Sequence, residues 1–416
     1  MDILPDMNLR HLQAVSAAGR LGSISKAAQV MNLSQPAITQ AIAKLEAQLG
    51  HQLLDRQPGG VQPTRAGNLI AERADRALGY IARGGQSVRR AARLPPLPHI
   101  ERRITYGHLR TLTTVDQAGS FALASGLTGL SEPALHRSAR DLEQLLGLLL
   151  LTRQGRTVQP TLAATVLLRF ARLAFAELRA GLDELAALRE EGAGQVTIGT
   201  LPMAQSILVP RALSRFSRTY PTARIGIVEG PYSDLLAGLR SGQVDLLIGA
   251  LRDPAPAKDI MQEALFTDDP VIVGRTGHPL ATSEDLDFTR LLDFPWIVAT
   301  AAAPARHLWE AMFAEKGLAA PSRHIETNSL VISRGMMLED DWLTLMSRDQ
   351  FVFERRAELL VEIGRATETP HRKLGLTVRT DWRPTQLQSA FVDMFRGITN
   401  EWNSGKPMDG KPFRYA

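Results

Sequence analysis

An internal repeat with a period of 97 residues constrains the fold of this 416-residue chain more than any other feature. The segments that are identical after a shift by 97 include Gly22-Ser23 and Gly119-Ser120, Leu33-Ser34 and Leu130-Ser131, and the four residues that start at Val61 and at Val158. Roughly 20 of about 59 ungapped positions are identical, far more than a chance match would give. The front half of the chain therefore contains one module twice.

The pattern within each copy predicts three short helices and a small β wing. In the first copy, helices are expected over 9–18, about 25–31 and from Ser34 to about 49, and the wing over 53–56 and 61–64. Ser34 suits the N-cap of the third helix, and Pro36 fits its first turn, where a missing N–H leaves no helical bond unmade. Apolar residues at helical spacing form one stripe of this helix.

Two helices joined by a short turn, the second with a polar outer face, predict a helix-turn-helix. Gln35, Thr39, Gln40 and Lys44 lie on that polar face, and side chains of this kind reach base edges and phosphates in DNA. Each copy taken alone is also compatible with an ordinary small helical bundle.

Charge is unevenly distributed along the chain, whose net charge is +5. Residues 1–192 hold 23 basic and 16 acidic side chains, a net of +7, whereas residues 193–416 hold 25 and 27, a net of −2. This asymmetry indicates that the front half meets a polyanion. The absence of cysteine excludes disulfides, thiol nucleophiles and cysteine-based zinc sites.

From Gly192 the pattern changes to alternating strands and helices, which predicts an α/β fold with parallel strands. Strands are expected over 195–200, 223–229 and 244–249, and helices over 204–220 and 233–241. This half has no phosphate-binding loop, no nucleophile elbow and no His-Glu-x-x-His motif. We therefore predict no catalytic residues, no metal site and no cofactor, and we do not expect an enzyme.

Four motifs of the first copy resemble the winged helix-turn-helix of LysR-type transcriptional regulators. They are Gly22-Ser-Ile-Ser-Lys-Ala-Ala28, Leu33-Ser-Gln-Pro-Ala37, Ile42-x-x-Leu45-Glu46 and Leu53-Leu-Asp-Arg56. The resemblance implies DNA binding through the helix that starts at Ser34. It places Gln35, Pro36 and Thr39 near bases, and Ser34, Gln40, Lys44, Arg56 and Thr64 near phosphates. Pro63 stands where the family usually has an aliphatic residue, which leaves the wing geometry open.

The second copy departs from the family, whose members usually carry one module. Glu132 replaces Gln35 and Asp141 replaces Lys44, so acids stand where DNA is expected. Glu132 also lies in the first turn of its helix, where an acid is a routine stabiliser. The candidates for a second DNA contact are His136, Arg137 and Arg153. We expect the second module to bind DNA weakly or not at all, and to position the dimer or contact a protein instead.

A long helix is predicted after each module, from 65 to about 93 and from 162 to about 189. The second carries a stripe that suits a dimerisation seam, made of Leu167, Ala171, Ala174, Leu178, Leu182 and Leu185. In the family this helix pairs two chains, but core packing within one chain would produce the same stripe. The spacer 94–98 between the modules holds three prolines and cannot be helical.

The resemblance extends to the back half. The motifs Gly194-x-Val-x-Ile-Gly199, Leu208-x-Pro210, Phe216-x-x-x-Tyr-Pro221 and the segment 239–249 are similar to the effector domain of the same regulators. The implied fold is that of type 2 periplasmic binding proteins, in which two α/β lobes are joined by two crossings. These crossings are expected near 273–275 and 376–379, with lobe one over about 193–273 and 376–402.

An effector is expected beyond the carboxyl ends of the strands, at helix N-termini whose free N–H groups favour an anion. The residues expected to contact it are Thr200, Gln205, Ser206, Thr300, Arg306, Thr327 and Ser329. Each Ser or Thr is equally compatible with a mere helix cap, and Arg306 with an ion pair to an acidic neighbour.

The predicted organisation is multidomain, with two all-α winged helix-turn-helix modules, long linker helices and a two-lobed α/β effector domain. Its segments are a first winged helix-turn-helix over 1–66, a linker helix and Pro-rich spacer over 67–105, a second module over 106–163, a linker or dimerisation helix over 164–192, an effector domain over 193–402 and a tail over 403–416.

These expectations describe a bacterial, cytoplasmic transcription regulator whose promoter binding responds to a small anionic or polar metabolite. The expected partners are double-stranded promoter DNA, an effector such as an aromatic acid or a sugar acid, further copies of the chain in a homodimer or homotetramer, and RNA polymerase as an additional candidate, with no membrane. The alternative from another class is an enzyme or solute-binding protein with a helical interaction front. That alternative leaves the duplicated helix-turn-helix without a purpose.

Overall fold

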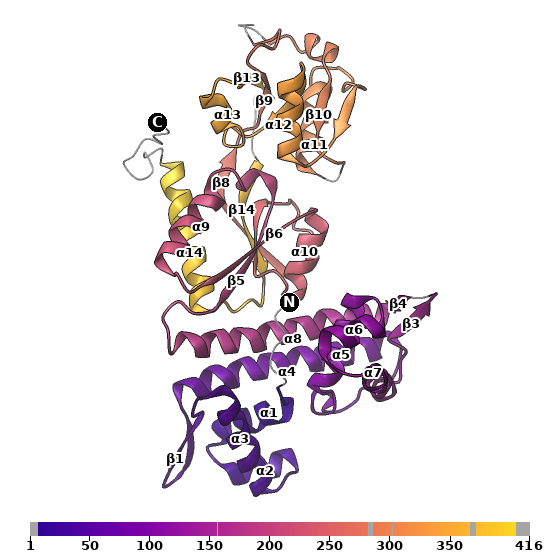
Figure 1. The fold of residues 1–416 in the computed structure, drawn as a ribbon, viewed down its shortest axis with the longest axis vertical. Coiled ribbons are helices and arrows are strands. Elements are labelled where there is room, and N and C mark those ends of the chain that lie inside the picture. Colours follow the sequence, from indigo (N-terminus) through magenta and orange to yellow (C-terminus); the bar gives the residue numbers. More distant parts are fainter. Residues whose placement is uncertain (1–6, 156, 282–285, 302, 367–371, 405–416) are drawn as a thin grey trace.

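The computed structural model describes residues 7–155, 157–281, 286–301, 303–366 and 372–404 (Figure 1). The chain forms two small helical modules, a pair of long helices and two α/β lobes. In the view of Figure 1 the first module lies below the helix pair, the second lies at its right-hand end, and the lobes lie above it. Most of the predicted tail, from 405 onward, lies outside the described residues.

Each module consists of three helices and a two-stranded antiparallel wing, as predicted. Module one (residues 7–64) contains α1 (Leu9–Leu21), α2 (Ile24–Met31), α3 (Gln35–Leu49), β1 (Leu54–Gln57) and β2 (Gly60–Pro63). Module two (residues 105–161) contains α5 (Tyr106–Ala118), α6 (Phe121–Thr128), α7 (Glu132–Leu146), β3 (Leu151–Gln154) and β4 (Thr157–Pro160). Gly50 and Gly147 end α3 and α7 with φ of 65° and 69°, a conformation that glycine adopts without strain.

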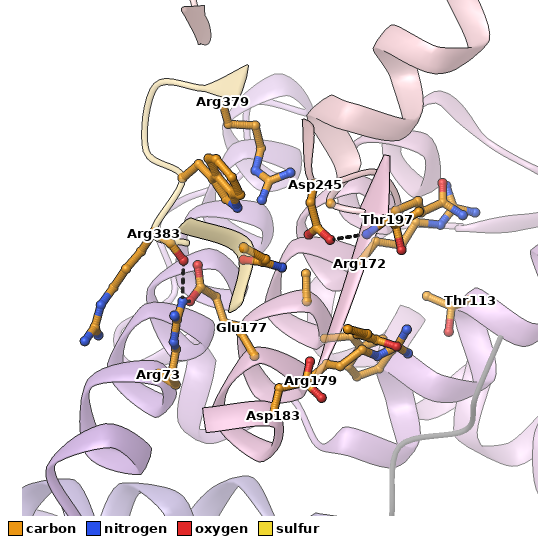
Figure 2. A pocket seen from close by; sticks show the side chains of 18 of the residues that line it. Arg73, Thr113, Arg172, Glu177, Arg179, Asp183, Thr197, Asp245, Arg379 and Arg383 are labelled. Carbon is orange, nitrogen blue, oxygen red and sulfur yellow. Dashed lines mark hydrogen bonds and ion pairs between the residues drawn. The ribbon is translucent and has the colours of Figure 1, made fainter. Parts of the chain in front are cut away.

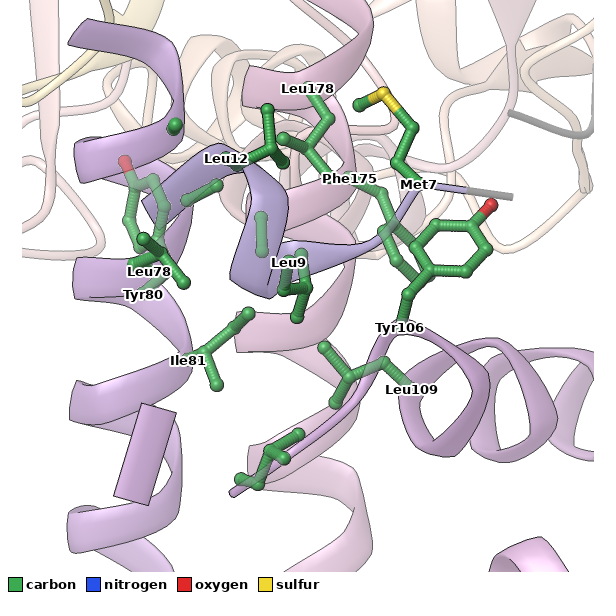
Figure 3. Packing of buried hydrophobic residues seen from close by; sticks show 14 of the residues in the cluster. Met7, Leu9, Leu12, Leu78, Tyr80, Ile81, Tyr106, Leu109, Phe175 and Leu178 are labelled. Atoms are coloured by element: carbon green, nitrogen blue, oxygen red, sulfur yellow. The ribbon is translucent and has the colours of Figure 1, made fainter. Parts of the chain in front are cut away.

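The two long helices, α4 (Arg65–Ala91) and α8 (Leu162–Ala187), pack side by side within the one chain (Figure 1). Five of the six residues of the stripe predicted on α8 are buried, since Leu167, Ala171, Ala174, Leu178 and Leu185 are at most 3% exposed, and Leu182 is partly buried against the same cluster. These residues share an apolar cluster with α4 and with α1, part of which is drawn in Figure 3. Of the two roles that the stripe left open, the structure shows packing within one chain. Between α4 and α5, the spacer 94–98 is not helical, and a short 3-10 turn, η1 (Ile100–Arg102), follows it.

Lobe one is a five-stranded sheet in the order β6-β5-β7-β14-β8. Its strands are β5 (Gln195–Thr200), β6 (Arg224–Glu229), β7 (Leu246–Ala250), β8 (Ile260–Asp268) and β14 (Arg372–Arg379), and its helices are α9 (Leu208–Thr219), α10 (Tyr232–Ser241) and α14 (Gln386–Asn403). β5 pairs parallel with β6 and β7, as expected from the alternating pattern, whereas β14 is antiparallel to both of its neighbours. The core lies between the sheet and the helices α9 and α14.

Lobe two is a second five-stranded sheet in the order β11-β10-β12-β9-β13. Its strands are β9 (Val271–Arg275), β10 (Trp296–Val298), β11 (His324–Glu326), β12 (Leu343–Met346) and β13 (Leu360–Arg365), and its helices are α11 (Pro304–Ala314), α12 (Leu330–Glu339) and α13 (Val352–Arg356). Trp296, Trp309 and Phe313 form the aromatic centre of its core.

The expected crossings between the lobes were placed several residues too late. The chain leaves lobe one between Asp268 and Val271 and returns between Arg365 and Arg372. The segments 273–275 and 376–379 belong instead to strands inside the lobes, because β9 pairs with β12 and β13, and β14 pairs with β7 and β8. No helix in the described part of the chain combines the length and apolar character needed to cross a membrane.

Candidate DNA-binding and effector-binding sites

Helix α3 presents one buried and one exposed face. The Ser34 hydroxyl accepts a hydrogen bond from Ala37 N at 3.3 Å and caps the helix as predicted. Ile38, Ile42 and Leu45 are buried, which leaves the opposite, polar face in solvent. Burial, and secondarily the charge of Lys44, lowers the pKa of His11 on α1.

Most of the predicted DNA contacts are exposed, although the Ser34 hydroxyl is engaged as the cap of α3. The exposed residues are Ser34, Gln35, Pro36, Gln40, Lys44 and Arg56. Thr39 and Thr64 are only partly exposed, and both hydroxyls are engaged in the module. Thr39 Oγ1 donates to Gln35 O at 3.0 Å, and Thr64 Oγ1 donates to Gln52 O at 2.8 Å and accepts from Gly67 N at 2.9 Å.

A glutamate near the end of α3 and another near the end of α7 hold the wings of their modules, a role that the sequence analysis missed. Glu46 Oε1 accepts hydrogen bonds from the backbone N–H groups of Leu53 at 2.8 Å and Leu54 at 3.2 Å. Glu143 makes the corresponding pair of bonds in module two, at 2.8 and 3.1 Å. The identity of these two glutamates under the 97-residue shift is a signal that could have found the contact.

Module two presents a different surface. Arg137 and Arg153 are exposed, but the third candidate, His136, is engaged. Its ring stacks on Phe121 with centroids 3.7 Å apart, and its Nε2 lies 3.6 Å from Glu132 Oε1. Glu132 therefore has a partner on its own helix, one turn away.

In lobe one the predicted effector residues gather where β5 ends. Thr200 is 1% exposed, and Gln205 Nε2 donates to its hydroxyl at 3.1 Å. The expected helix over 204–220 begins later than predicted: a 3-10 turn, η2 (Pro202–Ala204), precedes α9, which starts at Leu208. Pro210 has no N–H for the carbonyl of Ser206, which disfavours a continuous helix from residue 204. Gln205 and Ser206 consequently lie in the turn before α9.

In lobe two the predicted hydroxyls gather where the parallel strands β10 and β11 end. Asn328 Nδ2, which the sequence analysis missed, donates to Thr300 Oγ1 at 2.8 Å. Thr327 Oγ1 accepts from Ser329 N at 3.0 Å, and Ser329 Oγ caps α12 by accepting from Ile332 N at 3.3 Å. Three predicted residues are thus brought together in one cluster, and Ser329 has the capping role that was weighed as its alternative.

Arg306 is paired with acidic neighbours. Its Nε lies 2.7 Å from Glu310 Oε1, its Nη1 lies 2.8 Å from Glu326 Oε1, and its guanidinium covers the ring of Trp309. The ion pair with Glu310 is the first cause of the raised pKa of Arg306. Its charge is therefore balanced by two carboxylates.

A cavity of about 340 Å³ lies elsewhere, where α5 and α8 meet lobe one (Figure 2). Its lining includes Arg172, Asp183, Thr197, Asp245 and Arg379, and none of the seven predicted effector residues. Burial raises the pKa of Asp183 to about 7 and that of Asp245 to about 6. These side chains come from segments that are far apart in the chain, so no local pattern marks them.

Lobe one is docked on both long helices. Arg73 Nη1 of α4 donates to Arg383 O at 2.9 Å, and Tyr80 Oη of α4 donates to Asp381 Oδ2 at 2.8 Å. From α8, Arg169 is paired with Asp259. Among the described residues, no group of three or more His, Asp or Glu side chains is placed to hold a metal ion.

Two family profiles match the chain in the places that the geometry indicates. The profile "Bacterial regulatory helix-turn-helix protein, lysR family" matches residues 9–68 and again 106–165, and the profile "LysR substrate binding domain" matches residues 189–398.

Individual relatives agree with these matches. The transcriptional regulator GalR of Pseudomonas putida is 31% identical over 394 residues, 95% of this chain and 98% of that protein. The regulator PcaQ of Agrobacterium fabrum is 27% identical over 307 residues, 74% of this chain and 99% of that protein. A full-length OxyR variant from Pseudomonas aeruginosa has a TM-score of 0.54 at 18% identity, covers 71% of this chain and 94% of that chain, and supports the fold.

The relatives identified by sequence are transcriptional regulators and not enzymes, in agreement with the prediction. With two helix-turn-helix modules, a two-lobed effector domain and a GalR relative aligned over nearly its whole length, the chain belongs to the LysR family of bacterial transcriptional regulators.

Proposed function

We propose that module one binds promoter DNA through α3, and that a small anionic or polar metabolite between the two lobes modulates this binding. The observation that carries the DNA assignment is the exposed polar face of a capped helix whose apolar face is buried. Gln35, Pro36 and Thr39 would lie near bases. Ser34, Gln40, Lys44, Arg56 and Thr64 would lie near phosphates.

The effector assignment is supported by the two polar clusters at the carboxyl ends of parallel strands, where α/β folds bind ligands. Thr200, Gln205 and Ser206 would contact it from lobe one, and Thr300, Thr327 and Ser329 from lobe two. Arg306 is already paired with Glu310 and Glu326, so an anionic group of the effector would bind it only by displacing one of these carboxylates. Aromatic acids and sugar acids are the two classes to test.

The docking of lobe one supports a route from effector to DNA. Hydrogen bonds and ion pairs attach it to α4 and α8, which in turn carry the modules. An effector that prefers one arrangement of the lobes would therefore bias the arrangement of the modules by at most the free energy of that preference. Homodimer or homotetramer formation and contact with RNA polymerase stay predictions from the family resemblance.

The DNA assignment is tested with two variants of the exposed face. Gln35→Ala should relax base preference at one position, whereas Lys44→Ala should weaken binding to all sequences about equally and lower the salt dependence. Binding isotherms on specific and random duplexes at several salt concentrations measure both effects. Identical behaviour of the two variants would contradict the division of roles.

The effector assignment is tested by thermal unfolding of the full chain with aromatic acids and sugar acids. An acid that binds at a concentration 100 times its Kd should stabilise the chain by about 2.7 kcal/mol. Thr300→Val should reduce this shift for the same acid. An undiminished shift in Thr300→Val and in Thr200→Val would place the ligand elsewhere, for which the cavity beside Asp183 is the alternative.

A further inference from the structure

Two contacts between α4 and α8 are equivalent: in each, a glycine of one helix lies against a residue of the other helix, at positions that the repeat aligns. Gly84 of α4 lies against Phe170 of α8, where a Cβ on the glycine would come within 2.7 Å of the Phe170 Cβ. Gly181 of α8 lies against Arg73 of α4, where a Cβ would come within 3.3 Å of the Arg73 Cβ. The 97-residue shift converts Gly84 into Gly181 and Arg73 into Phe170. The helices are therefore antiparallel and related by an approximate two-fold axis.

A similar exchange occurs at the ends of α3 and α7, although the 97-residue shift aligns Arg89 with Ala186 and Leu146 with Leu49. Arg89, in the last turn of α4, donates to Leu146 O at the end of α7, at 2.6 Å. Arg189, just beyond α8, donates to Gly50 O at the end of α3, also at 2.6 Å. Each long helix thus holds the recognition helix of the other module. Reciprocal contacts of this kind define a two-fold interface, which normally joins two copies of a chain.

The surfaces that the axis relates are not equivalent in chemistry. Four aligned outer positions of α3 and α7 differ, namely Gln35 and Glu132, Thr39 and His136, Gln40 and Arg137, and Lys44 and Asp141, whereas Pro36 and Pro133 are identical. Gln favours adenine and Arg favours guanine in the major groove, so unlike helices select unlike base pairs. Arg137 and Arg140 of α7 and Arg153 of the wing are exposed and supply positive charge, while Glu132 is engaged with His136.

We infer that a single chain is a complete two-module DNA-binding unit and that its operator consists of two unlike half-sites, one contacted by α3 and the other by α7. This inference rests on the proposed DNA binding by α3 and replaces the expectation that module two has little affinity of its own. A perfect inverted repeat, which suits two identical modules, is not the duplex that this chain fits.

The test is selection of duplexes from a random pool by the full-length protein, together with the mass of the complex by native mass spectrometry. The expected site has two different half-sites. One chain, with its two modules, binds each such pair of half-sites. Arg137→Ala with Arg140→Ala should weaken binding to this site at least about tenfold and erase selection of one half only. Arg323→Ala, which removes an exposed arginine of lobe two, is the matched control and should change neither.

A gain-of-specificity variant completes the test. Replacing the outer face of α7 by that of α3 (Glu132→Gln, His136→Thr, Arg137→Gln and Asp141→Lys) should convert the selected site into an inverted repeat of the α3 half-site. Unchanged affinity and selection in the module-two variants, or a wild-type site that is a perfect inverted repeat bound through module one of two chains, would overturn the inference and leave the proposed function standing. Failure of the wild-type protein to select any sequence would instead refute the proposed function.

Discussion

At the scale of single residues, burial of charge is the most consequential feature outside the exposed face of α3. Asp183 of α8 is 7% exposed and lies on the cavity beside lobe one. Burial is the first cause of its raised pKa, the nearby carboxylate of Asp245 adds to it, and Arg224 and Arg179 oppose it. The folded chain therefore favours the neutral form of this side chain.

Asp183→Asn should flatten the pH dependence of stability. Because the folded-state pKa of about 7 exceeds the ordinary 3.8, the folded chain keeps a proton that the unfolded chain has lost, and the stabilisation present below pH 3.8 is lost as the pH rises to about 7. One such site contributes at most about 1.4 kcal/mol per pH unit to the slope. Urea unfolding between pH 5 and 8 measures it. Asp287→Asn is the control, because the hydrogen bond from Thr289 lowers the pKa of Asp287 and keeps its titration below this interval.

At the scale of elements, the two long helices approach closely because small residues lie at their crossing. Gly84 leaves no room for a side chain against Phe170, whereas Gly79, on the same helix, would meet nothing within 4 Å. Substitution of the two glycines by alanine therefore distinguishes the effect of helix packing on stability from the effect of helix propensity.

Gly79→Ala should stabilise the chain by up to about 1 kcal/mol, because alanine has the higher helix propensity and open space receives its methyl group. Gly84→Ala gains the same propensity but forces α4 and α8 apart, and should destabilise by about 1–3 kcal/mol. Thermal unfolding of both variants measures the difference. Equal stabilisation by both substitutions would show that the helices do not pack as closely as described.

At the scale of the whole molecule, one buried arginine connects three parts of the structure. Arg73 of α4 is 1% exposed, and its guanidinium lies 2.8 Å from Glu177 and 2.6 Å from Glu184 of α8. The same group donates to the backbone of Arg383, which follows the last strand of lobe one. The long helices and the effector domain therefore share one polar network.

Arg73→Leu should destabilise the full chain by about 3–5 kcal/mol, because it leaves the largely buried carboxylate of Glu184 without its cation, while Glu177 keeps only its ion pair with Arg76. Arg83→Ala removes an arginine from the same helix whose side chain is 57% exposed and 3.6 Å from Asp381, and should cost less than about 1 kcal/mol. Calorimetry of both variants checks the contrast. The double variant Arg73→Leu with Glu184→Leu should recover part of the loss, and no recovery would argue against a charge-based origin.

The sequence by itself determined the two modules and the cap of α3, since α3 depends on Ser34, Pro36 and an apolar stripe within 15 residues. The late start of α9 was also readable from the sequence, because Pro210 lacks the N–H that a helix from residue 204 would need. The apolar pattern alone had suggested that earlier start. Local hydrogen bonds and helical spacing are short-range properties and can be inferred from neighbouring residues.

Only the tertiary structure decided which surface meets which. The stripe on α8 is equally apolar whether α4 of the same chain or a second chain covers it. The hydrophobic effect depends on the apolar area removed from water and not on which chain covers that area. The crossings between the lobes depend on which strands share hydrogen bonds, and the cavity beside Asp183 depends on segments of α4, α5, α8 and lobe one that meet only after folding. These are long-range pairings. The contacts that stabilise them join residues far apart in the chain, so a short stretch of sequence does not reveal them.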